Sequence, residues 1–257
     1  MTTVRAQDQE DGVRLLTLDR PPANAIDQTL LADLAAALDD AGADDAVRAV
    51  VLTGAGRFFS GGLDLAAAAG DQALAGMVLA PYRDTHLRLL TFPKPTIAMV
   101  NGHAIAGGLI VVLACDYRVG LDGDYRIGLN EVAIGASFPR AAFETVRLRL
   151  THGQASELLL GADLYAASEA VRLGVVAELL PADAFEATVL RRAARLGAFP
   201  REAYAHTKAA LAAEAVERIE SETAEEAVRG AAVWMTPESV AAREAQREKL
   251  GKRTPKG

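Results

Sequence analysis

The sequence has little of what disulfide-bonded, nucleic-acid-binding or membrane-spanning proteins need. Its 257 residues include one cysteine, Cys115, which excludes an intrachain disulfide and a zinc site built from several thiolates. Lys and Arg number 27 against 34 Asp and Glu, and the net charge of −7 disfavours broad contact with nucleic acid or an anionic membrane. The most apolar run, Ile105–Cys115, is far shorter than the ~20 residues that span a bilayer. We therefore expect a cytoplasmic protein with no nucleic-acid or membrane partner.

Motifs of several common enzyme classes are also missing. The chain has no G-x-x-x-x-G-K-[ST] phosphate loop, no H-E-x-x-H zinc motif and no G-x-S-x-G nucleophile motif. Gly54-Ala55-Gly56 lacks the third glycine of the dinucleotide-binding fingerprint, and the four histidines do not have metal-ligand spacing. The composition, 51% apolar and 24% charged, is ordinary for a soluble globular enzyme. At ~150 residues per domain, the length allows one large domain or two small ones.

The first half of the chain alternates strand-like runs with helical patterns. Residues Val13–Leu18 are predicted to form a strand, and apolar runs predict buried strands over Ala49–Thr53 and Thr96–Val100. Asp27 is the expected N-cap of a helix over Thr29–Ala41, whose leucines recur every four residues. The shorter predicted strands are Asp116–Val119 and Tyr125–Gly128, and the other predicted helices are a region reaching Phe92, Leu109–Cys115, Glu169–Leu173 and Pro237–Leu250. This alternation predicts right-handed α/β units with a parallel sheet, followed from about residue 138 by an almost wholly helical region.

Two glycine loops each follow a predicted buried strand. Gly61–Asp64 comes after the strand at 49–53, and Ala106–Gly108 comes after the strand at 96–100 and opens a helix. In α/β sheets, ligands bind beyond the carboxyl ends of strands, where glycine lets the backbone approach closely. If both loops point N–H groups into one crevice, they form a two-donor oxyanion hole, and the second loop adds the positive end of a helix. The alternative is that these glycines only allow tight turns and close helix packing.

Glu131 is the candidate general base. It follows a short predicted strand and is flanked by the apolar residues Leu129, Val132 and Ile134, which favour partial burial. Burial raises the pKa of a carboxyl toward the range that suits a general base. On these residues alone, the alternative is a salt-bridged or exposed loop glutamate.

Five motifs, in order along nearly the whole chain, resemble those of the crotonase (enoyl-CoA hydratase/isomerase) superfamily. Arg20–Ile26 resembles the family's early loop, and Phe59–Leu65 (FSGGLDL) resembles its F-S-A-G-x-D-L. Lys94–Gly102 (KPTIAMVNG) resembles K-P-x-I-A-x-V-N-G. Ala106–Gly108 and Ala114–Asp116 together resemble G-G-G…A-C-D. Each motif alone is moderately specific, and five in the same order make the resemblance strong.

The resemblance implies an α/β fold of the crotonase/ClpP-like type. This fold is a spiral of strand–strand–helix turns with a C-terminal helical region that builds trimers, often paired into hexamers. Residues 1–196 would form the spiral core with the CoA-binding and catalytic site, and residues 197–257 the helical oligomerisation region. The family binds acyl-CoA thioesters and stabilises an enolate on the thioester oxygen. Coenzyme A is then part of the substrate, and no metal or redox cofactor is implied.

The same resemblance assigns roles to individual positions. The two oxyanion donors would be the backbone N–H groups of Leu63 and Gly107, and Glu131 would carry the proton. Substrate-binding positions would lie in the early loop, in both glycine loops, in the K-P motif and in the helix after the second loop. These positions are Asn24, Ala25, Ile26, Gly61, Asp64, Lys94, Gly108 and Ile110.

The chain departs from the hydratase pattern at one position. A hydratase holds its water between two glutamates, and the resemblance places the second at Glu131 but Ile110 where the first should be. Isoleucine can neither accept nor donate a proton. One carboxyl is enough for an enoyl-CoA isomerase, because the same group removes a proton at C2 and returns it at C4 while the oxyanion hole holds the dienolate. The string around Glu131 also resembles mitochondrial-type isomerases. We therefore favour an isomerase that moves a 3-enoyl-CoA double bond to position 2.

Two alternatives stay open. One is water addition by a hydratase, as in fatty acid β-oxidation. The other is a non-catalytic acyl-CoA-binding protein on the same fold, for which tight CoA-ester binding without turnover would be the signature. The sequence does not predict the length of the acyl chain.

Overall fold

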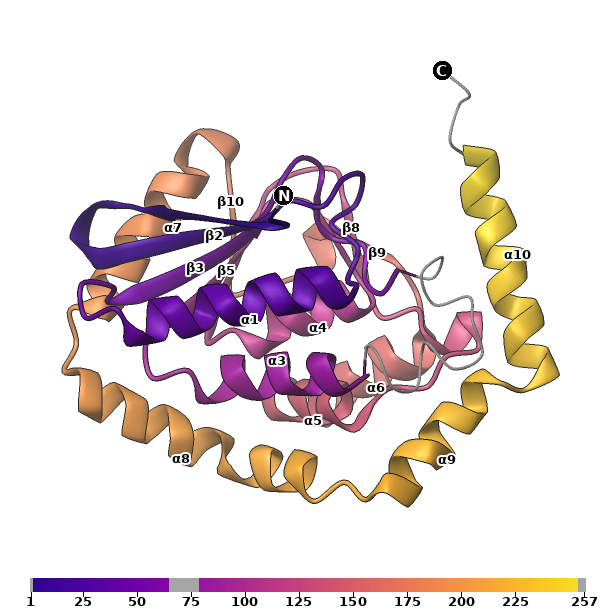
Figure 1. Cartoon of the computed structure of the whole chain (residues 1–257). Helices are drawn as coiled ribbons and strands as arrows, with labels where there is room; N and C mark the ends of the chain where they lie inside the picture. Colours follow the sequence, from indigo (N-terminus) through magenta and orange to yellow (C-terminus); the bar gives the residue numbers. More distant parts are fainter. Residues whose placement is uncertain (1, 65–78, 254–257) are drawn as a thin grey trace.

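The computed structural model describes residues 2–64 and 79–253, which form two β-sheets surrounded by helices (Figure 1). Among these residues, the larger sheet has six strands in the order β1-β2-β3-β5-β7-β10, and the smaller has four in the order β4-β6-β8-β9. The strands of the larger sheet are β1 Val4–Asp8, β2 Val13–Leu18, β3 Ala49–Gly54, β5 Thr96–Val100, β7 Tyr117–Leu121 and β10 Leu179–Leu180. Those of the smaller sheet are β4 Phe58–Ser60, β6 His103–Ile105, β8 Arg126–Gly128 and β9 Tyr165–Ala166. Pairing is parallel except for β1 with β2 and β8 with β9.

Helices cover both faces of the larger sheet. The α-helices are α1 Gln28–Ala43, α3 Leu79–Thr91, α4 Gly107–Ala114, α5 Arg140–Arg149, α6 His152–Gly161, α7 Ala182–Gly197, α8 Arg201–Glu220, α9 Ala224–Trp234 and α10 Pro237–Arg253, with 3-10 turns η1 Glu10–Gly12, η2 Val132–Ile134 and η3 Ala167–Glu169. Leu52 of β3 joins the apolar core on the α1 side, whereas its neighbour Val51 joins the core under α7. Because successive side chains of a strand face opposite sides, a sheet buried on both faces requires uninterrupted apolar runs.

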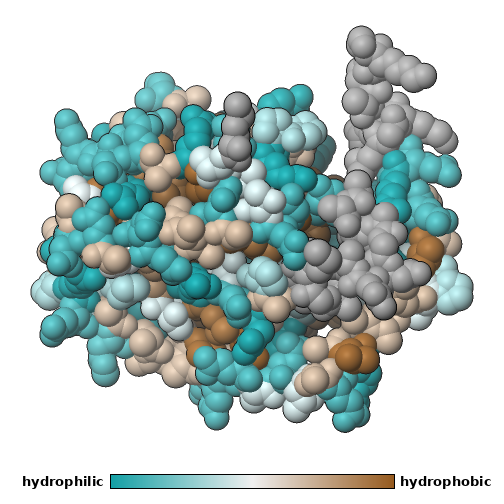
Figure 2. All heavy atoms as spheres, in the orientation of Figure 1, coloured by the Kyte–Doolittle hydropathy of each residue, from teal (hydrophilic) through white to brown (hydrophobic). Residues whose placement is uncertain are grey.

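The last three α-helices wrap around this body. In Figure 1, α8 runs along the lower edge, and α9 and α10 continue up one side. α8 packs on α3 and α5, and α10 packs on η2. Figure 2 shows that hydrophilic residues cover most of the viewed face, with small hydrophobic patches between them. No helix among the described residues is long and apolar enough to cross a bilayer.

The main sequence predictions of secondary structure are confirmed. β2 and β5 have the predicted bounds, β3 is one residue longer, and the pairing of β2, β3, β5 and β7 is parallel. Asp27 caps α1, since its Oδ1 accepts from the N–H of Leu30 at 2.8 Å. The last part of the helical region predicted to reach residue 92 is α3, which ends at Thr91. Residues 65–78, which precede α3, lie outside the described part of the chain.

Several elements differ from the prediction. The strands β1, β4, β6, β9 and β10 were not predicted. β1 has an exposed and polar pattern, β4 and β6 are three-residue strands beside the glycine loops, and β9 and β10 have two residues each. The helix predicted over Glu169–Leu173 is only the 3-10 turn η3 followed by turns. α4 begins at Gly107, two residues earlier than predicted, which places a helix N-terminus directly in the second glycine loop.

Candidate active site

The two glycine loops meet at the ends of β4 and β6. Gly62 makes this approach possible, because a Cβ there would lie 2.8 Å from the Cβ of Ala106 and 3.2 Å from the N atom of Gly107. Its φ of +86° is also a conformation that L side chains rarely adopt. In the same way, a Cβ on Gly108 would lie 2.4 Å from the carbonyl oxygen of Ser60. Only glycine allows the two loops to pack so closely.

The N–H groups of Leu63 and Gly107 occupy adjoining positions. Around Leu63, Ile26 N donates to Gly62 O at 2.8 Å, and Asp64 N donates to Ile26 O at 2.9 Å. In a parallel bridge of this kind, the N–H of the middle residue, Leu63, points away from Ile26. Gly107 is the first residue of α4, and the first N–H groups of a helix have no acceptor within the helix. Both amides are therefore suited to donate to a ligand, and the second adds the positive end of a helix.

Glu131 is tied to the second loop through β8. The N–H of Ala106 donates to the carbonyl of Gly128, three residues before Glu131, at 2.8 Å. The Glu131 residue is 8% exposed, and its Oε2 is buried with no hydrogen-bond partner among the described residues. Burial raises the pKa of Glu131 to about 8, and a hydrogen bond from its own main chain only partly opposes this. A carboxyl with such a pKa can both take up and release a proton near neutral pH.

Tyr82 lies beside Gly107, in the region 74–86 that the sequence places in the pocket wall without singling out this residue. Its Cε2 and hydroxyl oxygen lie 3.5 and 3.6 Å from the position that a Cβ on Gly107 would occupy. Burial, and to a smaller extent the negative charge of Glu131, raises the pKa of Tyr82. The phenol is therefore an uncharged O–H group beside Gly107. The only signal in the sequence is its spacing from His86, whose ring lies 4.1 Å from that of Tyr82 and whose Nδ1 bonds the Tyr82 carbonyl at 2.7 Å.

The early loop supports the first glycine loop. Asn24 is 2% exposed, and its amide donates to the carbonyls of Ala55 and Phe58 at 3.0 and 2.8 Å. Its Oδ1 accepts from the N–H of Arg20, and the Arg20 guanidinium pairs with Asp64 at 2.7 Å. Both predicted positions, Asn24 and Asp64, thus hold the loop that carries Leu63.

The other predicted positions around this loop take part mainly through their main chain. The carbonyl of Ala25 accepts from Arg20 at 3.2 Å, and the N–H of Gly61 donates to Ala23 O at 2.8 Å. Ile26 is 1% exposed, and its Cδ1 lies 3.5 Å from the position that a Cβ on Gly107 would occupy. The structure therefore brings the early loop and both glycine loops together.

Lys94 and Ile110 are the remaining predicted positions, and both are buried. Lys94 precedes β5 and so lies at the end of that strand opposite the second glycine loop. It is 1% exposed, and its ammonium donates to the carbonyls of Ala41 and Asp44, at the end of α1, at 2.6 and 2.7 Å. Ile110 is fully buried in the core. Both side chains are buried, and their part in binding substrate stays a prediction.

Lys94→Met is expected to lower the free energy of unfolding by about 1–3 kcal/mol, because two carbonyls at the C-terminal end of α1 lose a charged donor. Urea unfolding measures this loss, and the Kd for an acyl-CoA is expected to stay unchanged. Unchanged stability with weakened acyl-CoA binding would instead support the prediction that Lys94 binds substrate.

Other polar candidates are used structurally. Cys115 is buried, and burial raises the pKa of its thiol to about 12, which leaves no nucleophilic thiolate near neutral pH. Within residues 2–64 and 79–253, no three His, Cys, Asp or Glu side chains are grouped to hold a metal ion. The described site brings together two amides, one carboxyl and one phenol.

Comparison with known proteins decides the family. A family model described as "Enoyl-CoA hydratase/isomerase" matches residues 8–247. The chain belongs to this family. The crystal structure of human mitochondrial delta3-delta2-enoyl-CoA isomerase superposes with a TM-score of 0.92 and 27% identity, covering 99% of this chain and 100% of that chain. The fold is the α/β crotonase fold with two mixed sheets and C-terminal helices, as the sequence resemblance implied.

Some relatives within the family are named as isomerases and others as hydratases. "Enoyl-CoA delta isomerase 1, mitochondrial" of Homo sapiens is 32% identical over 204 residues, 78% of this chain and 67% of the relative. The "2,3-dehydroadipyl-CoA hydratase" of Escherichia coli is 36% identical over 178 residues, 68% of each chain. Relatives from Thermus thermophilus and Bacillus subtilis are 42% and 33% identical, and the chain spans 63% and 64% of their length. Identity alone therefore does not separate isomerase from hydratase.

Proposed function

We propose that the protein is an enoyl-CoA isomerase that converts 3-enoyl-CoA thioesters to 2-enoyl-CoA thioesters. The observation that carries the proposal is the single buried carboxyl of Glu131 beside two main-chain donors. A buried isoleucine, Ile110, stands where a hydratase would need its other glutamate. Among the described residues, Glu131 is then the one carboxyl of this site, which suits double-bond migration and does not suit activation of a water molecule between two carboxyls.

The proposed mechanism has two proton transfers. The thioester oxygen accepts hydrogen bonds from the N–H groups of Leu63 and Gly107, each worth about 2.7–4 kcal/mol in the transition state. The Glu131 carboxylate removes a proton from C2, and the electron pair of that C–H bond forms a dienolate whose charge rests on the thioester oxygen. The Glu131 carboxylic acid then gives its proton to C4, and the double bond is left between C2 and C3. No atom is gained or lost overall.

Product mass is the direct test of this reaction. Purified protein incubated with a 3-enoyl-CoA is expected to give a 2-enoyl-CoA of unchanged mass, identified by chromatography and mass spectrometry. The same protein given a 2-enoyl-CoA is expected to add no water. Rapid formation of a product heavier by one water from the 2-enoyl-CoA would instead establish the runner-up function, hydration.

The pH dependence follows from the raised pKa of Glu131. The base must be deprotonated in the free enzyme, so kcat/KM is expected to rise with pH up to about 8 and to level off above it. Below that pH, kcat/KM should fall about tenfold per unit, since each unit lowers the carboxylate fraction tenfold. A profile that is flat from pH 5 to 9 would contradict the assignment of Glu131 as the base.

We also propose that residues 197–257 form the oligomerisation region of a homotrimer or hexamer. The support is the family's use of C-terminal helices and the position of α9 and α10 along one side of the body in Figure 1. Light scattering of the purified protein tests this, and a monomer at micromolar concentration would contradict it.

A further inference from the structure

A short turn at 131–136 carries the proposed base. The carbonyl oxygen of Glu131 accepts from the N–H groups of Ile134 and Ala136 at 3.1 and 2.8 Å. Gly135, which lies between these two donors, has a φ of +68° that closes the turn. The place of the Glu131 main chain therefore depends on where Gly135 is held.

The C-terminal helix α10 packs directly on this turn. A Cβ on Gly135 would clash with the Cα of Ser239, so the two main chains touch with no side chain between them. One helical turn further along α10, the Arg243 guanidinium donates from Nη1 to the carbonyl oxygen of Gly135 at 2.9 Å. Its Nη2 donates to the carbonyl oxygen of Trp234, the last residue of α9. Arg243 thus ties the 131–136 turn to the ends of two helices.

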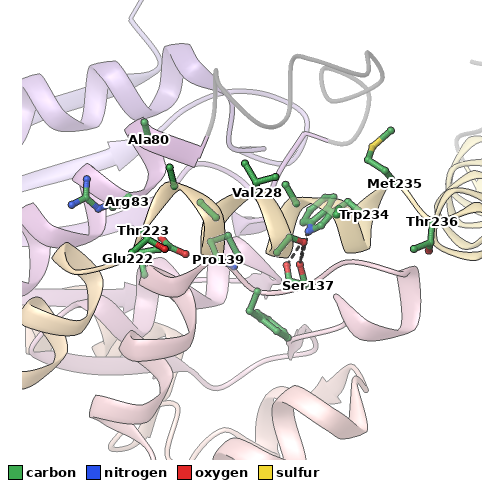
Figure 3. A pocket seen from close by; sticks show the side chains of 17 residues that line it. Ala80, Arg83, Ser137, Pro139, Glu222, Thr223, Val228, Trp234, Met235 and Thr236 are labelled. Carbon is green, nitrogen blue, oxygen red and sulfur yellow. Dashed lines mark hydrogen bonds between the residues drawn. The ribbon is translucent and has the colours of Figure 1, made fainter.

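The indole of Trp234 gives the same guanidinium a second route to the turn. The Arg243 Cζ lies 5.4 Å from the centre of the indole ring. Figure 3 shows the indole beside Ser137, to whose carbonyl and hydroxyl oxygens its Nε1 donates at 3.2 and 3.0 Å. Ser137 directly follows the turn, and Leu63 packs against the apolar cluster that contains Trp234 and Ala136. The guanidinium, the turn and the first oxyanion loop therefore form one packed unit.

A buried guanidinium is an unusual choice for packing alone. The Arg243 residue is 7% exposed, and burial lowers its pKa. Its partners within residues 2–64 and 79–253 are two carbonyl oxygens and an aromatic ring, and none of them is a carboxylate. Burying a charge without a counter-ion is destabilising unless its donors are bonded. An apolar side chain would pack without that cost, whereas the forked donors of arginine can hold two carbonyls at once.

We propose that Arg243 is a positioning residue for catalysis, which holds the 131–136 turn so that the Glu131 carboxyl stays buried and aimed at the substrate. The inference rests on the proposed role of Glu131 as the base and adds a residue of α10 to the site. Arg243 acts through position and not through charge. Burial is what raises the pKa of Glu131, opposed only by its own main chain, and the titratable side chain that responds to the Glu131 charge is Tyr82 of α3.

Arg243→Met tests the role, because methionine still packs on the indole but has no donor for either carbonyl. Above pH 9, where Glu131 is ionised, kcat for a 3-enoyl-CoA is expected to fall about 10–100-fold, the effect of a small misplacement of a catalytic group. The Kd for butanoyl-CoA is expected to stay unchanged. A looser turn also lets water reach the carboxyl, so the inflection of kcat/KM is expected to move from about pH 8 to a value lower by ~1 pH unit or more.

Two further variants separate this role from a general loss of stability. Arg140 of α5 also joins the body to the C-terminal helices, but its Nη2 donates to Glu226 of α9 at 3.0 Å and not to the turn. Arg140→Met is therefore expected to keep the wild-type kcat and inflection. Arg243→Lys keeps the charge and one bonding centre, so its kcat and inflection are expected to lie between those of the wild type and Arg243→Met. It also serves as the test variant should Arg243→Met fail to fold.

A second measurement does not depend on turnover. Urea unfolding at pH 5 and pH 9, with and without Glu131→Gln, gives the pH-dependent part of the stability that Glu131 contributes. Repeating the pair in the Arg243→Met background completes a double-mutant cycle. The pH-dependent part is expected to shrink there, because a carboxyl that water reaches has a folded pKa nearer its ordinary value of 4.5.

Three results would overturn the proposal. The first is an inflection and a pH-dependent stability that are the same in Arg243→Met and the wild type. The second is an equal loss of kcat in Arg243→Met and Arg140→Met. The third is a loss of kcat that accompanies a change of oligomeric state in Arg243→Met, measured by light scattering, since α10 would then act in assembly. The isomerase fails separately: a wild type that converts no 3-enoyl-CoA refutes it, and the unfolding cycle still decides whether Arg243 holds Glu131.

Discussion

Replacing Glu131 by glutamine is expected to lower isomerase turnover by about 10²–10⁴-fold, the range that general acid–base catalysis contributes. Glutamine has nearly the same shape as glutamate but cannot take a proton from C2. The two main-chain donors are untouched, so the Kd for a saturated acyl-CoA should change little. Steady-state kinetics with a 3-enoyl-CoA and titration with a saturated ester measure the two quantities separately. Near-wild-type turnover would remove Glu131 from the mechanism.

The same variant has a stability signature that an exposed or salt-bridged glutamate would not give. Since the pKa of Glu131 is raised to about 8 in the folded protein, its contribution to stability is fully present below the ordinary pKa of 4.5 and is lost as pH rises through about 8. Glutamine does not ionise, so Glu131→Gln should gain stability relative to the wild type over this interval, by an amount on the order of a few kcal/mol. Urea unfolding at pH 5 and pH 9 measures the difference. A difference that does not change with pH would contradict burial of the charge.

Gly62→Ala is expected to lower kcat/KM by about 10²–10³-fold, the loss that follows removal of one oxyanion donor. The added methyl would lie 2.8 Å from both the Ile105 carbonyl oxygen and the Ala106 Cβ, so the two loops must separate. Separation displaces the N–H of Leu63 relative to that of Gly107. The measurement is kcat/KM with a short 3-enoyl-CoA.

Gly56→Ala is the matched control for this prediction. Gly56 has a similar φ of +70°, but a Cβ there meets nothing within 4 Å. Both variants therefore suffer the backbone strain of alanine at positive φ, roughly 1 kcal/mol, and only Gly62→Ala pushes the loops apart. Equal activity of the two variants would show that the contact between the loops does not position the donors.

The parts of the fold that the sequence predicted are those with a strong local pattern. Strands β3 and β5 are buried on both faces, and their sequences are nearly unbroken apolar runs. Asp27 directly precedes a leucine-rich helix, which is the position of an N-cap residue. β1 was missed because four of its five residues are exposed and its pairing with β2 is not visible in its own composition. Strands β4 and β6 have three residues each, too few to show an alternation of apolar and polar side chains.

The site was predictable to the extent that its residues lie in family motifs. The contact between Gly62 and Gly107 joins positions far apart in the chain. Spacing alone therefore could not decide whether the two glycine loops form an oxyanion hole or only allow tight turns and close helix packing. Lys94 lies in such a motif, yet its ammonium binds the end of α1, a partner that only the tertiary structure reveals. Tyr82 was not singled out within the predicted pocket wall at 74–86, because a tyrosine within an amphipathic helix has the same local pattern whether it faces a core or a site.

A structure of the protein with a bound, non-reacting acyl-CoA tests the proposed catalytic geometry most directly. We predict that the thioester oxygen lies about 2.7–3.1 Å from both the Leu63 and Gly107 nitrogens, with the Glu131 carboxyl facing C2 and C4. A thioester oxygen bound away from either amide, or a Glu131 carboxyl turned away from those carbons, would contradict the mechanism.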